Sequence, residues 1–533
     1  MLQSAIRNRS CRRRRKLLIE AVAKVVAAGA NYEKMRFSYQ EYFKKMQNPS
    51  DWGLPFEALL GAIKIQNDLK LPSIGGKDSM SGTFKDVHVP PMLMAFGITT
   101  VDANEVISTE FKDVNNYLYL AKHEHLDKYL PNIESLKSNF KNINEAIKEK
   151  KIISAYALGF GGLSEALAKM SFGNKIGYDV NVSEEDLFDL SYGSILVESN
   201  TELSFGTLIG KTSEKVVING TSFDMEEMLE ANTVKFEEIY KSKTNVSGTL
   251  NVESYEKKTF VYPYEAKIPT VYVPVFPGTN CDYDTIKAFK VAGANIATSV
   301  FKNITEQDIE DSIIEMANYI KNCDIFMLSG GFSAGDEPDG SAKFIANVLM
   351  APKVKAEIDK LIERKGLILG ICNGFHALVK SGLLPYSKLG ELSVESPTLF
   401  RNDINRHISQ MVRTRVSSTN SPWLSSFNDG DVHTIAVSHG EGKFVVSAEM
   451  YNDLKANGQI AFQYVDYENN PTMESPMNPN GSSYAIEGIV SQDGLILGKM
   501  GHTERYEKNV FKNIYGDKFQ NIFENAMNYF KKN

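Results

Sequence analysis

Cysteine is scarce in this chain of 533 residues, which holds four thiols, at Cys11, Cys281, Cys323 and Cys372. So few cysteines argue against a disulfide framework and are typical of a protein in a reducing cytoplasm. A long apolar run is also missing, because no stretch reaches the ~18 consecutive residues that a membrane-spanning helix needs. The sequence therefore predicts a cytoplasmic protein without a membrane partner.

A surplus of positive charge is missing as well, since 59 Lys and Arg face 66 Asp and Glu and leave a formal net charge of −7. The bulk electrostatics of the chain therefore argue against nucleic acid as a partner. Residues 1–15 differ from the rest, with six arginines and no acidic residue. A transit peptide or a basic arm would share that composition, but the sequence becomes ordinary from Lys16 onward. We expect residues 1–15 to be a disordered start.

The composition is that of a globular protein of about three domains, with 42% hydrophobic and 23% charged residues. Lys241–Ile268 is polar, contains Gly and Pro and lacks helical periodicity, so it marks a boundary. Mixed helix and strand patterns before it predict an α+β half. The predicted divisions are a first subdomain at residues 16–105, a second at 106–245, a linker at 246–268 and a further domain at 269–533.

Hydrophobic periodicity predicts the main elements of these domains. An amphipathic helix is expected between Ile133 and Ile147, where apolar residues recur at steps of three and four. Another is expected at the end of the chain, over Tyr515–Phe530. From Val271 to Leu328 strand and helix patterns alternate, which predicts an α/β domain with a doubly wound, mostly parallel sheet. Functional side chains then belong at the carboxyl ends of its strands.

A dense polar loop is predicted in the first half, at Gly75–Phe84. Its candidate binding residues are Gly75, Gly76, Lys77, Asp78, Ser79 and Ser81. Paired glycines beside Lys, Asp and Ser are suited to cradle a phosphate or to present a carboxylate to Mg²⁺. A polar turn between strands would have the same composition, and the spacing is not that of a P-loop.

The second half is organised around Gly366–Pro385, which reads GLILGICNGFHALVKSGLLP. A short apolar strand runs into G-x-C-x-G and then into a helix, which is the nucleophile-elbow pattern with Cys372 in place of serine. The glycines are needed because the nucleophile of such an elbow sits in a sharp, strained turn. A buried structural cysteine beside a turn is the other interpretation.

A cysteine nucleophile needs a base, and the base usually needs an orienting carboxylate. His502 and Glu504 follow a strand-like segment and lie two residues apart, so both side chains can face one site. His439 is a rival base that the residues alone leave open, whereas His376 fits better as a helix residue after the elbow. The backbone N–H groups of Asn373 and of the Gly330-Gly331 pair are candidates for an oxyanion hole, with Gly331 preferred.

Six motifs of the second half occur in one order between Pro277 and Arg505: PGTNCD, LSGGFSAGD, GICNGFHAL followed by GLLP, SHGEG, NPNGS and GHTER. With them the second half resembles the class I (triad) glutamine amidotransferases, and more narrowly the glutaminase domain of phosphoribosylformylglycinamidine synthases. The first half, from about Glu20, resembles the second synthetase lobe of the same enzymes through LPSIGGKDSMSGTF and GFGGLSEALAKMSFGN.

The resemblance implies a glutamine-hydrolysing ligase of purine biosynthesis. Enzymes of this family pass the ammonia to a synthetase site, where ATP and Mg²⁺ activate formylglycinamide ribonucleotide and the ammonia converts it into the amidine. By motif, Cys372 is the nucleophile, His502 the base and Glu504 its orienting partner. The segment Gly75–Ser81 falls where relatives bind nucleotide and substrate, and Glu20 matches an acid associated with Mg²⁺-nucleotide.

Several positions depart from the family pattern. Lys24 replaces an amide residue that accompanies the acid matched by Glu20, and Ala157 and Phe160 stand where many relatives carry two acids. GHTER replaces the commoner M-P-H-P-E-R, although its His and Glu remain. His376 stands where relatives often have Gln.

The large single-chain members of the family also carry an N-terminal domain, a linker and a first synthetase lobe upstream of the matched region. We therefore expect a C-terminal portion of the synthase that by itself is competent only for the glutaminase half-reaction. Its missing partner is the first synthetase lobe, on the same gene or on a separate chain. The alternative is a stand-alone glutaminase or amidotransferase subunit whose first half is a docking or structural-nucleotide scaffold.

Overall fold

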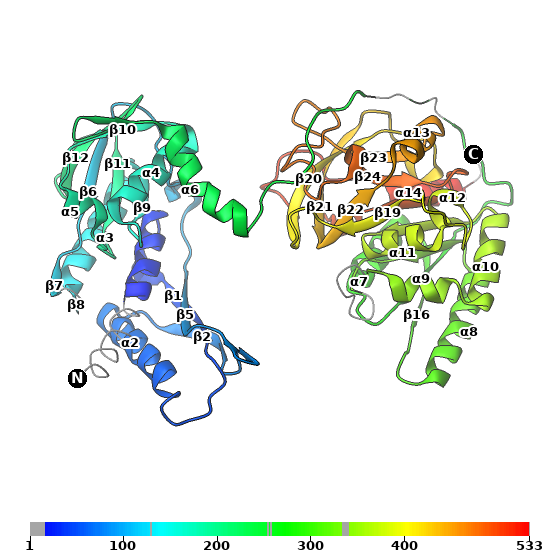
Figure 1. The fold of residues 1–533 in the computed structure, drawn as a ribbon, viewed down its shortest axis with the longest axis horizontal. Helices are drawn as coiled ribbons and strands as arrows, with labels where there is room; N and C mark the ends of the chain where they lie inside the picture. Colours follow the sequence, from blue (N-terminus) through cyan, green and yellow to red (C-terminus); the bar gives the residue numbers. More distant parts are fainter. Residues whose placement is uncertain (1–15, 128–129, 253–254, 256–257, 333–340, 532–533) are drawn as a thin grey trace. The chain divides into compact units, whose positions relative to one another are not determined.

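The computed structural model describes residues 16–127, 130–252, 255, 258–332 and 341–531, and the chain divides into two compact units between Lys235 and Phe236 (Figure 1). Each unit has apolar clusters of its own. The predicted disordered start, residues 1–15, lies outside the described residues. Among the described helices, none combines the length and hydropathy that crossing a bilayer requires.

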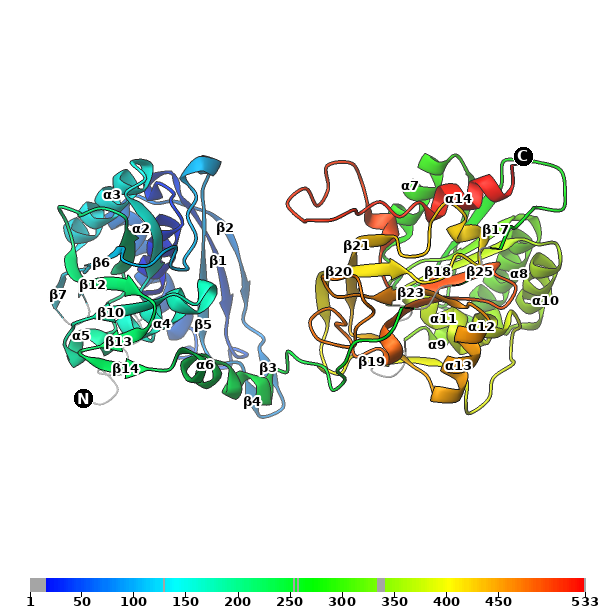
Figure 2. The same cartoon turned by 90° about the horizontal axis from the view of Figure 1, so that it is seen from above.

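A three-stranded sheet forms one part of the first unit (Figure 2). Its central strand β1 (Arg36–Tyr42) pairs in parallel with β2 (Ser73–Ser79) and antiparallel with β5 (Met92–Ile98). Helix α2 (Gly53–Leu69) buries its Ala58 and Ile65 face in the same apolar cluster as the inner face of this sheet. The small hairpin β3 (Thr83–Phe84) and β4 (Val87–His88) follows β2.

The expectation of a loop at Gly75–Phe84 is wrong for its first half, because Gly75 to Ser79 belong to β2. The backbone of this segment is paired with β1, and pairing in register outweighs the turn preference of two glycines. Gly76 also has a steric reason to lack a side chain, since a Cβ there would lie 2.7 Å from the carbonyl oxygen of Tyr39.

A seven-stranded sheet forms the other part of the first unit, in the order β14-β13-β10-β12-β6-β11-β9. Its strands are β6 (Tyr117–Ala121), β9 (Ile152–Ala157), β10 (Gly177–Val180), β11 (Ile195–Ser199), β12 (Thr207–Ser213), β13 (Val216–Ile218) and β14 (Thr221–Phe223). Successive residues of β6 join different apolar clusters, Leu118 on one face and Tyr119 on the other. Helix α4 (Gly162–Asn174) covers the first face and α3 (Ile133–Lys148) the second.

The remaining elements of the first unit include a helix that is buried in the core, with Leu18, Val22 and Val26 in the same apolar cluster as α3. They are the helix over residues 16–27, η1 (Tyr32–Lys34), η2 (Ala103–Glu105), β7 (His125–Asp127), β8 (Leu130–Pro131), α5 (Glu184–Phe188) and α6 (Met225–Ile239), within which the division between the units falls. The predicted amphipathic helix at Ile133–Ile147 is confirmed by α3, which buries Leu136, Phe140 and Ile143.

A nine-stranded sheet is the centre of the second unit, in the order β16-β15-β17-β18-β25-β24-β23-β20-β21. Its strands are β15 (Thr270–Val275), β16 (Asn295–Val300), β17 (Ile325–Leu328), β18 (Leu367–Ile371), β20 (Ile408–Val416), β21 (Val432–His439), β23 (Ile460–Tyr464), β24 (Ile486–Val490) and β25 (Ile496–Lys499). The neighbouring strands β16, β15, β17, β18 and β25 run parallel, as the alternation of strand and helix patterns predicts. The remaining strands of the sheet pair antiparallel.

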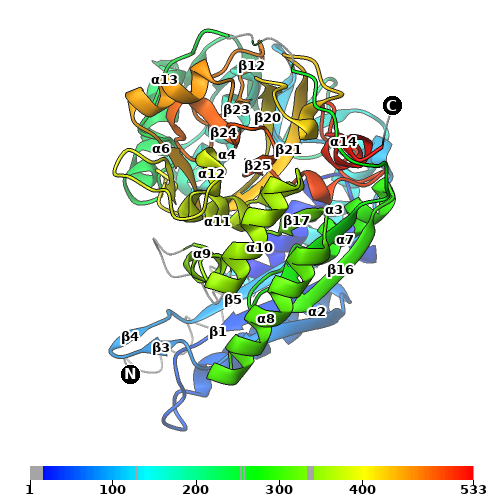
Figure 3. The same ribbon diagram turned by 90° about the vertical axis from the view of Figure 1, so that its right-hand side faces the viewer.

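Helices cover both sides of the parallel strands, so β17 and β18 are buried along their whole length. The helices are α7 (Asp282–Ala292), α8 (Glu306–Asn322), α9 (Lys343–Leu349), α10 (Pro352–Glu363), α11 (Asn373–Ser381), α12 (Leu383–Tyr386), α13 (Ala448–Ala456) and α14 (Ile522–Tyr529). Helices α8 and α10 lie side by side (Figure 3). The short strands β19 (Thr398–Arg401) and β22 (Glu441–Val445) form a separate pair.

The last helix is shorter than predicted, because α14 begins at Ile522 and not at Tyr515. Gly516 has φ +99, and a Cβ there would overlap the hydroxyl of Thr434, so the chain cannot be helical at this point. Asp517 accepts a hydrogen bond from the backbone N–H of Phe519, which is a local turn in place of a helical turn.

Candidate active site

Cys372 occupies the turn between β18 and α11, in the strand–cysteine–helix arrangement that the sequence predicts. Its backbone has φ 54 and ψ −110, a conformation that a residue with a side chain rarely adopts. A Cβ on Gly370 would lie 2.6 Å from the backbone of Gly374, and one on Gly374 would overlap the carbonyl oxygen of Leu328. The two flanking glycines are therefore what allows the sharp turn to pack against β17.

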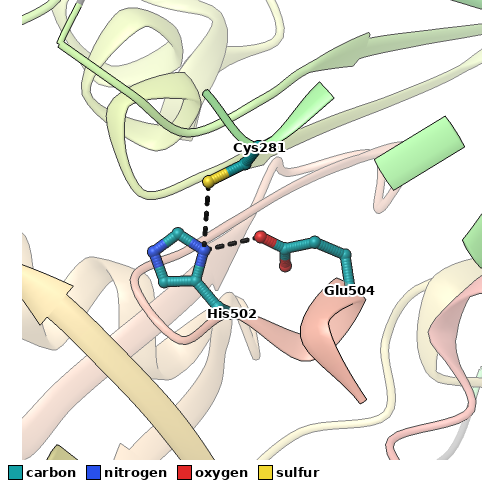
Figure 4. Close-up of side chains that lie close together, drawn as sticks. All are labelled: Cys281, His502 and Glu504. Atoms are coloured by element: carbon teal, nitrogen blue, oxygen red, sulfur yellow. Dashed lines mark hydrogen bonds and ion pairs between the residues drawn. The ribbon is translucent and has the colours of Figure 1, made fainter. Parts of the chain in front are cut away.

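His502 and Glu504 come from the turn that follows β25, which includes η5 (Thr503–Arg505). The Nδ1 atom of His502 lies 2.5 Å from Oε1 of Glu504, and both residues are buried (Figure 4). With the Nδ1–H donating to the carboxylate, Nε2 is left as the basic nitrogen. Among the described residues this Nε2 atom has no hydrogen-bond partner.

The charges of this pair reinforce one another. Burial alone lowers the pKa of His502, but the negative charges of Glu504 and Cys372 outweigh it and raise the pKa well above its ordinary value. Burial raises the pKa of Glu504, yet the charge and hydrogen bond of His502 lower it below its ordinary value. An imidazolium is thus stabilised where a base that accepts a proton needs it.

Cys372 and His502 line one cavity of about 60 Å³, to which Gly331, Phe332, Asn373 and Arg505 also contribute. Gly330 allows the two side chains to approach each other. A Cβ on Gly330 would lie 2.9 Å from Cε1 of His502 and 3.4 Å from Cβ of Cys372. The structure therefore brings together the predicted nucleophile, base and orienting acid, and the two residues predicted for the oxyanion hole.

His439, the rival base, lines the same cavity. Burial lowers its pKa to about 3, and its Nδ1 lies 3.2 Å from the amide oxygen of Asn402. A neutral amide does not stabilise an imidazolium as a carboxylate does, so the surroundings of His502 suit a base better. His376 lies in α11, where its Nε2 donates a hydrogen bond of 2.6 Å to the carbonyl oxygen of Glu441.

Two residues at this site were missed by sequence reasoning, Cys281 and Arg505. Sγ of Cys281 lies 3.9 Å from Nδ1 of His502 (Figure 4). Nη2 of Arg505 donates to the same sulfur at 3.3 Å. A signal existed for Cys281, because it follows the carboxyl end of the parallel strand β15 as Cys372 follows that of β18.

The predicted binding residues of the first unit lie along β2 and just after it. Gly75, Gly76, Lys77 and Asp78 line a cavity of about 740 Å³ together with Tyr39, Glu41 and residues of α2. Ser79 and Ser81 do not belong to this lining, although their hydroxyl groups lie 3.5 Å from each other. The structure brings the first four residues to one cavity.

Glu20 does not have the surroundings of a Mg²⁺ ligand. Its carboxylate lies 2.7 Å from Nζ of Lys24, so the residue that departs from the family pattern neutralises it. The nearby carboxylate of Glu165 accepts from the N–H of Gly161 and forms an ion pair with Lys169. Mg²⁺ needs several oxygen ligands that are free to bind, and this donor set does not fit it.

Comparison with known proteins assigns the second unit to a family. Residues 268–530 match the model of the CobB/CobQ-like glutamine amidotransferase domain. The phosphoribosylformylglycinamidine synthase subunit PurQ of Salinibacter ruber is 32% identical over 257 residues, which cover 48% of this chain and 95% of that subunit. The PurQ subunit of Methanococcus maripaludis is 33% identical over 286 residues, which cover 50% of this chain and 98% of that subunit.

The chain belongs to the PurQ family of glutamine amidotransferases. The PurQ-like region includes the elbow at Cys372, the His502–Glu504 turn and the cavity between them. Among solved structures, PurLQS of Thermotoga maritima matches with 26% sequence identity and a TM-score of 0.36, over 50% of this chain and 100% of that one. T. maritima PurL complexed with ATP matches with 12% identity and a TM-score of 0.33, over 48% of this chain and 44% of that one.

Proposed function

We propose that the second unit hydrolyses glutamine with Cys372, His502 and Glu504 and supplies the ammonia for the synthesis of formylglycinamidine ribonucleotide. One observation carries the proposal: in a PurQ-family domain, an elbow cysteine shares one cavity with the histidine of a buried His–Glu pair. The family's PurQ subunits belong to phosphoribosylformylglycinamidine synthase, a role in purine biosynthesis that we extend to this chain.

The geometry supports a two-step hydrolysis. In the first step the sulfur of Cys372 attacks the side-chain amide carbon of glutamine, and Nε2 of His502 takes the thiol proton and gives it to the departing ammonia. The backbone N–H groups of Asn373 and Gly331 stabilise the oxyanion. In the second step water attacks the thioester with His502 as base, and glutamate leaves as the thiol of Cys372 is restored. Glu504 holds the imidazole throughout.

The first unit is proposed to be one synthetase lobe of the ATP-driven ligase. ATP, when bound to the complete synthase, supplies the phosphoryl group that activates the amide oxygen of formylglycinamide ribonucleotide. In this chain Lys77 lines the large cavity beside β2 and offers the positive charge that a phosphate needs. No step is assigned to Glu20, because Lys24 neutralises it.

The first unit also has the surface expected of a lobe with a partner. Ser73–Asp78 of the edge strand β2 are exposed, with Ile74 66% accessible. On α2, Phe56 is 63% accessible and Ile63 50%, so the outward face of this helix is apolar. An open strand edge beside an apolar helix face favours association with another protein surface. The proposed occupant is the first synthetase lobe of the same enzyme class.

The glutaminase proposal is tested by incubating the chain with a glutamine-analogue alkylator, 6-diazo-5-oxonorleucine, and mapping the adduct by mass spectrometry. We expect one adduct, on Cys372, and no adduct in Cys372→Ser. Cys281→Ser is the matched control and should still be labelled at Cys372. An adduct on Cys281 or on any residue other than Cys372 overturns the assignment of the nucleophile.

A second candidate function is a stand-alone glutaminase whose first unit is only a docking scaffold. The ion pair between Glu20 and Lys24 and the buried Ala157 in place of an acid favour it. Synthesis of formylglycinamidine ribonucleotide from glutamine, ATP and the substrate, by this chain together with a separately expressed first lobe, would exclude this second function. Glutaminase activity without ligation under those conditions supports it.

A further inference from the structure

Three donor atoms of different chemistry meet beside the proposed triad. Sγ of Cys281, Nδ1 of His502 and a carboxylate oxygen of Glu504 all lie within 4.8 Å of one another, and the three residues are buried (Figure 4). Cys281 caps the start of α7, whereas the other two residues come from the turn after β25. Two separate segments therefore present a thiol, an imidazole and a carboxylate to one point.

These donors match the preference of zinc. Zn²⁺ binds Cys sulfur, His nitrogen and carboxylate oxygen at ~2.0–2.3 Å in a tetrahedral arrangement, which places the donor atoms roughly 3.3–3.8 Å apart. Nδ1 of His502 lies 3.9 Å from Sγ of Cys281 and 2.5 Å from Oε1 of Glu504. Small movements of the side chains therefore suffice to bring the three donor atoms to the spacing of a tetrahedral zinc site. Hard cations such as Mg²⁺ avoid thiolates, which excludes them here.

The surroundings supply two further features of a zinc site. Oε2 of Glu504 is buried and has no hydrogen-bond partner among the described residues, so the carboxylate can offer a second oxygen. Arg505 donates an N–H group to Sγ of Cys281 at 3.3 Å. Zinc-bound thiolates are supported in this way by N–H donors of neighbouring groups.

We propose that Cys281, His502 and Glu504 form an inhibitory Zn²⁺ site, a proposal that rests on the glutaminase function proposed above. The ion binds the thiolate of Cys281, whose proton leaves to solvent, and the lone pair of Nδ1, so the proton of a neutral His502 ring moves to Nε2. The ion takes Glu504 from His502 and adds positive charge beside the base. His502 then no longer accepts the proton of Cys372, and glutamine hydrolysis stops.

Binding is tested without reference to activity by titrating the reduced full-length chain with Co²⁺, which substitutes for Zn²⁺ and gives a thiolate-to-metal absorption band. We expect one equivalent to produce the band, and added Zn²⁺ to remove it. The band should be lost in Cys281→Ser and kept in Cys323→Ser, whose thiol is buried elsewhere in the same unit. A band that survives in Cys281→Ser, or that is absent from the unaltered chain, overturns the site.

A second measurement on the unaltered chain does not depend on how a variant folds. Zn²⁺ should protect Cys281 from alkylation by iodoacetamide, as mapped by mass spectrometry, at least tenfold more than it protects Cys323. Equal protection of both thiols overturns the proposal.

The inhibitory effect is measured as the Zn²⁺ concentration that halves glutamine hydrolysis, relative to the metal-free rate of each variant. We expect this concentration to rise at least tenfold in Cys281→Ser and to stay unchanged in Cys323→Ser. If the chain binds Co²⁺ through Cys281 but hydrolyses no glutamine, the proposed function fails and the metal site stands. If it hydrolyses glutamine with the same zinc sensitivity in both variants, the inhibitory role fails and the glutaminase function stands.

Discussion

At the scale of single residues, one buried ion pair supports the turn that carries His502 of the proposed triad. Nζ of Lys499 lies 3.4 Å from Oε1 of Glu487, and both side chains are fully buried. The same ammonium donates to the carbonyl oxygen of Gly501 at 2.8 Å and to Oγ1 of Thr503 at 3.0 Å. The N–H of Gly501 in turn donates to Glu487 at 2.5 Å. The pair thus holds the residues on both sides of His502.

Lys499→Met is expected to destabilise the second unit by about 3–5 kcal/mol, because Glu487 would remain buried without a counter-charge. Burial already lowers the pKa of Lys499, which shows the cost of this charge that Glu487 and Glu504 offset. The double variant Glu487→Ala/Lys499→Met should recover most of the loss, because no unpaired charge is left. Urea unfolding measures both values, and a double variant as unstable as the single one would contradict the account.

The elbow glycines give a second prediction at this scale. Gly374→Ala places a Cβ against the carbonyl oxygen of Leu328 in β17, so we expect a loss of about 2–3 kcal/mol in stability together with the loss of glutaminase activity. Gly440→Ala is the stability control, since nothing lies within 4 Å of a Cβ at that position. Urea unfolding of both variants checks the prediction, and a stability loss of similar size in the control would contradict it.

At the scale of elements, local motifs were predictable and tertiary neighbours were not. The strand, cysteine and helix of the elbow are contiguous, so G-x-C-x-G is sufficient to predict them. The segment from Gly75 to Ser79 has the composition of a loop, and only its pairing with β1 makes it a strand. Cys281 reaches His502 because β15 and β25 belong to one sheet, which no local pattern contains.

Helix α11 carries His376, whose protonation makes the stability of the second unit depend on pH. Burial lowers the pKa of His376 from 6.5 to about 4. The neutral ring is therefore favoured in the folded state, and its contribution to stability is complete above pH 6.5 and is lost as pH falls towards 4. Between pH 7.5 and pH 5 this residue alone should cost the folded state about 2 kcal/mol.

His376→Gln removes this dependence, because the amide keeps a donor for the carbonyl oxygen of Glu441 without titrating. The free energy of unfolding in urea, measured at pH 7.5 and at pH 5, should therefore fall less in the variant by about 2 kcal/mol. His407→Gln, at an exposed ring that lies 3.1 Å from the Ser438 hydroxyl, serves as the control. A pH dependence unchanged in His376→Gln would assign the acid sensitivity to other groups.

At the scale of the whole molecule, each unit has its own core. The polar segment that precedes β15, residues 241–268, belongs to the second unit. The N–H of Leu250 donates a hydrogen bond to the carbonyl oxygen of Pro471 at 2.8 Å, and the N–H of Thr244 donates one to Oγ of Ser475. Tyr262 is buried against Tyr529 and Phe530, with ring centroids 5.4 and 4.7 Å away. The polar composition of this segment indicates a boundary, yet its Tyr262 packs in the core of the amidotransferase unit.

A fragment of residues 236–533 is therefore expected to fold alone and hydrolyse glutamine, because its core and proposed triad are complete. A fragment of residues 269–533 keeps the triad but loses Tyr262 and the hydrogen bonds of the preceding segment. Removing one large buried aromatic side chain costs roughly 3–5 kcal/mol, so the shorter fragment should be less stable by about 3 kcal/mol or more in urea. Tyr262→Ala in the longer fragment should reproduce most of that loss. Equal stability of the two fragments would show that the segment contributes nothing to the fold of the second unit.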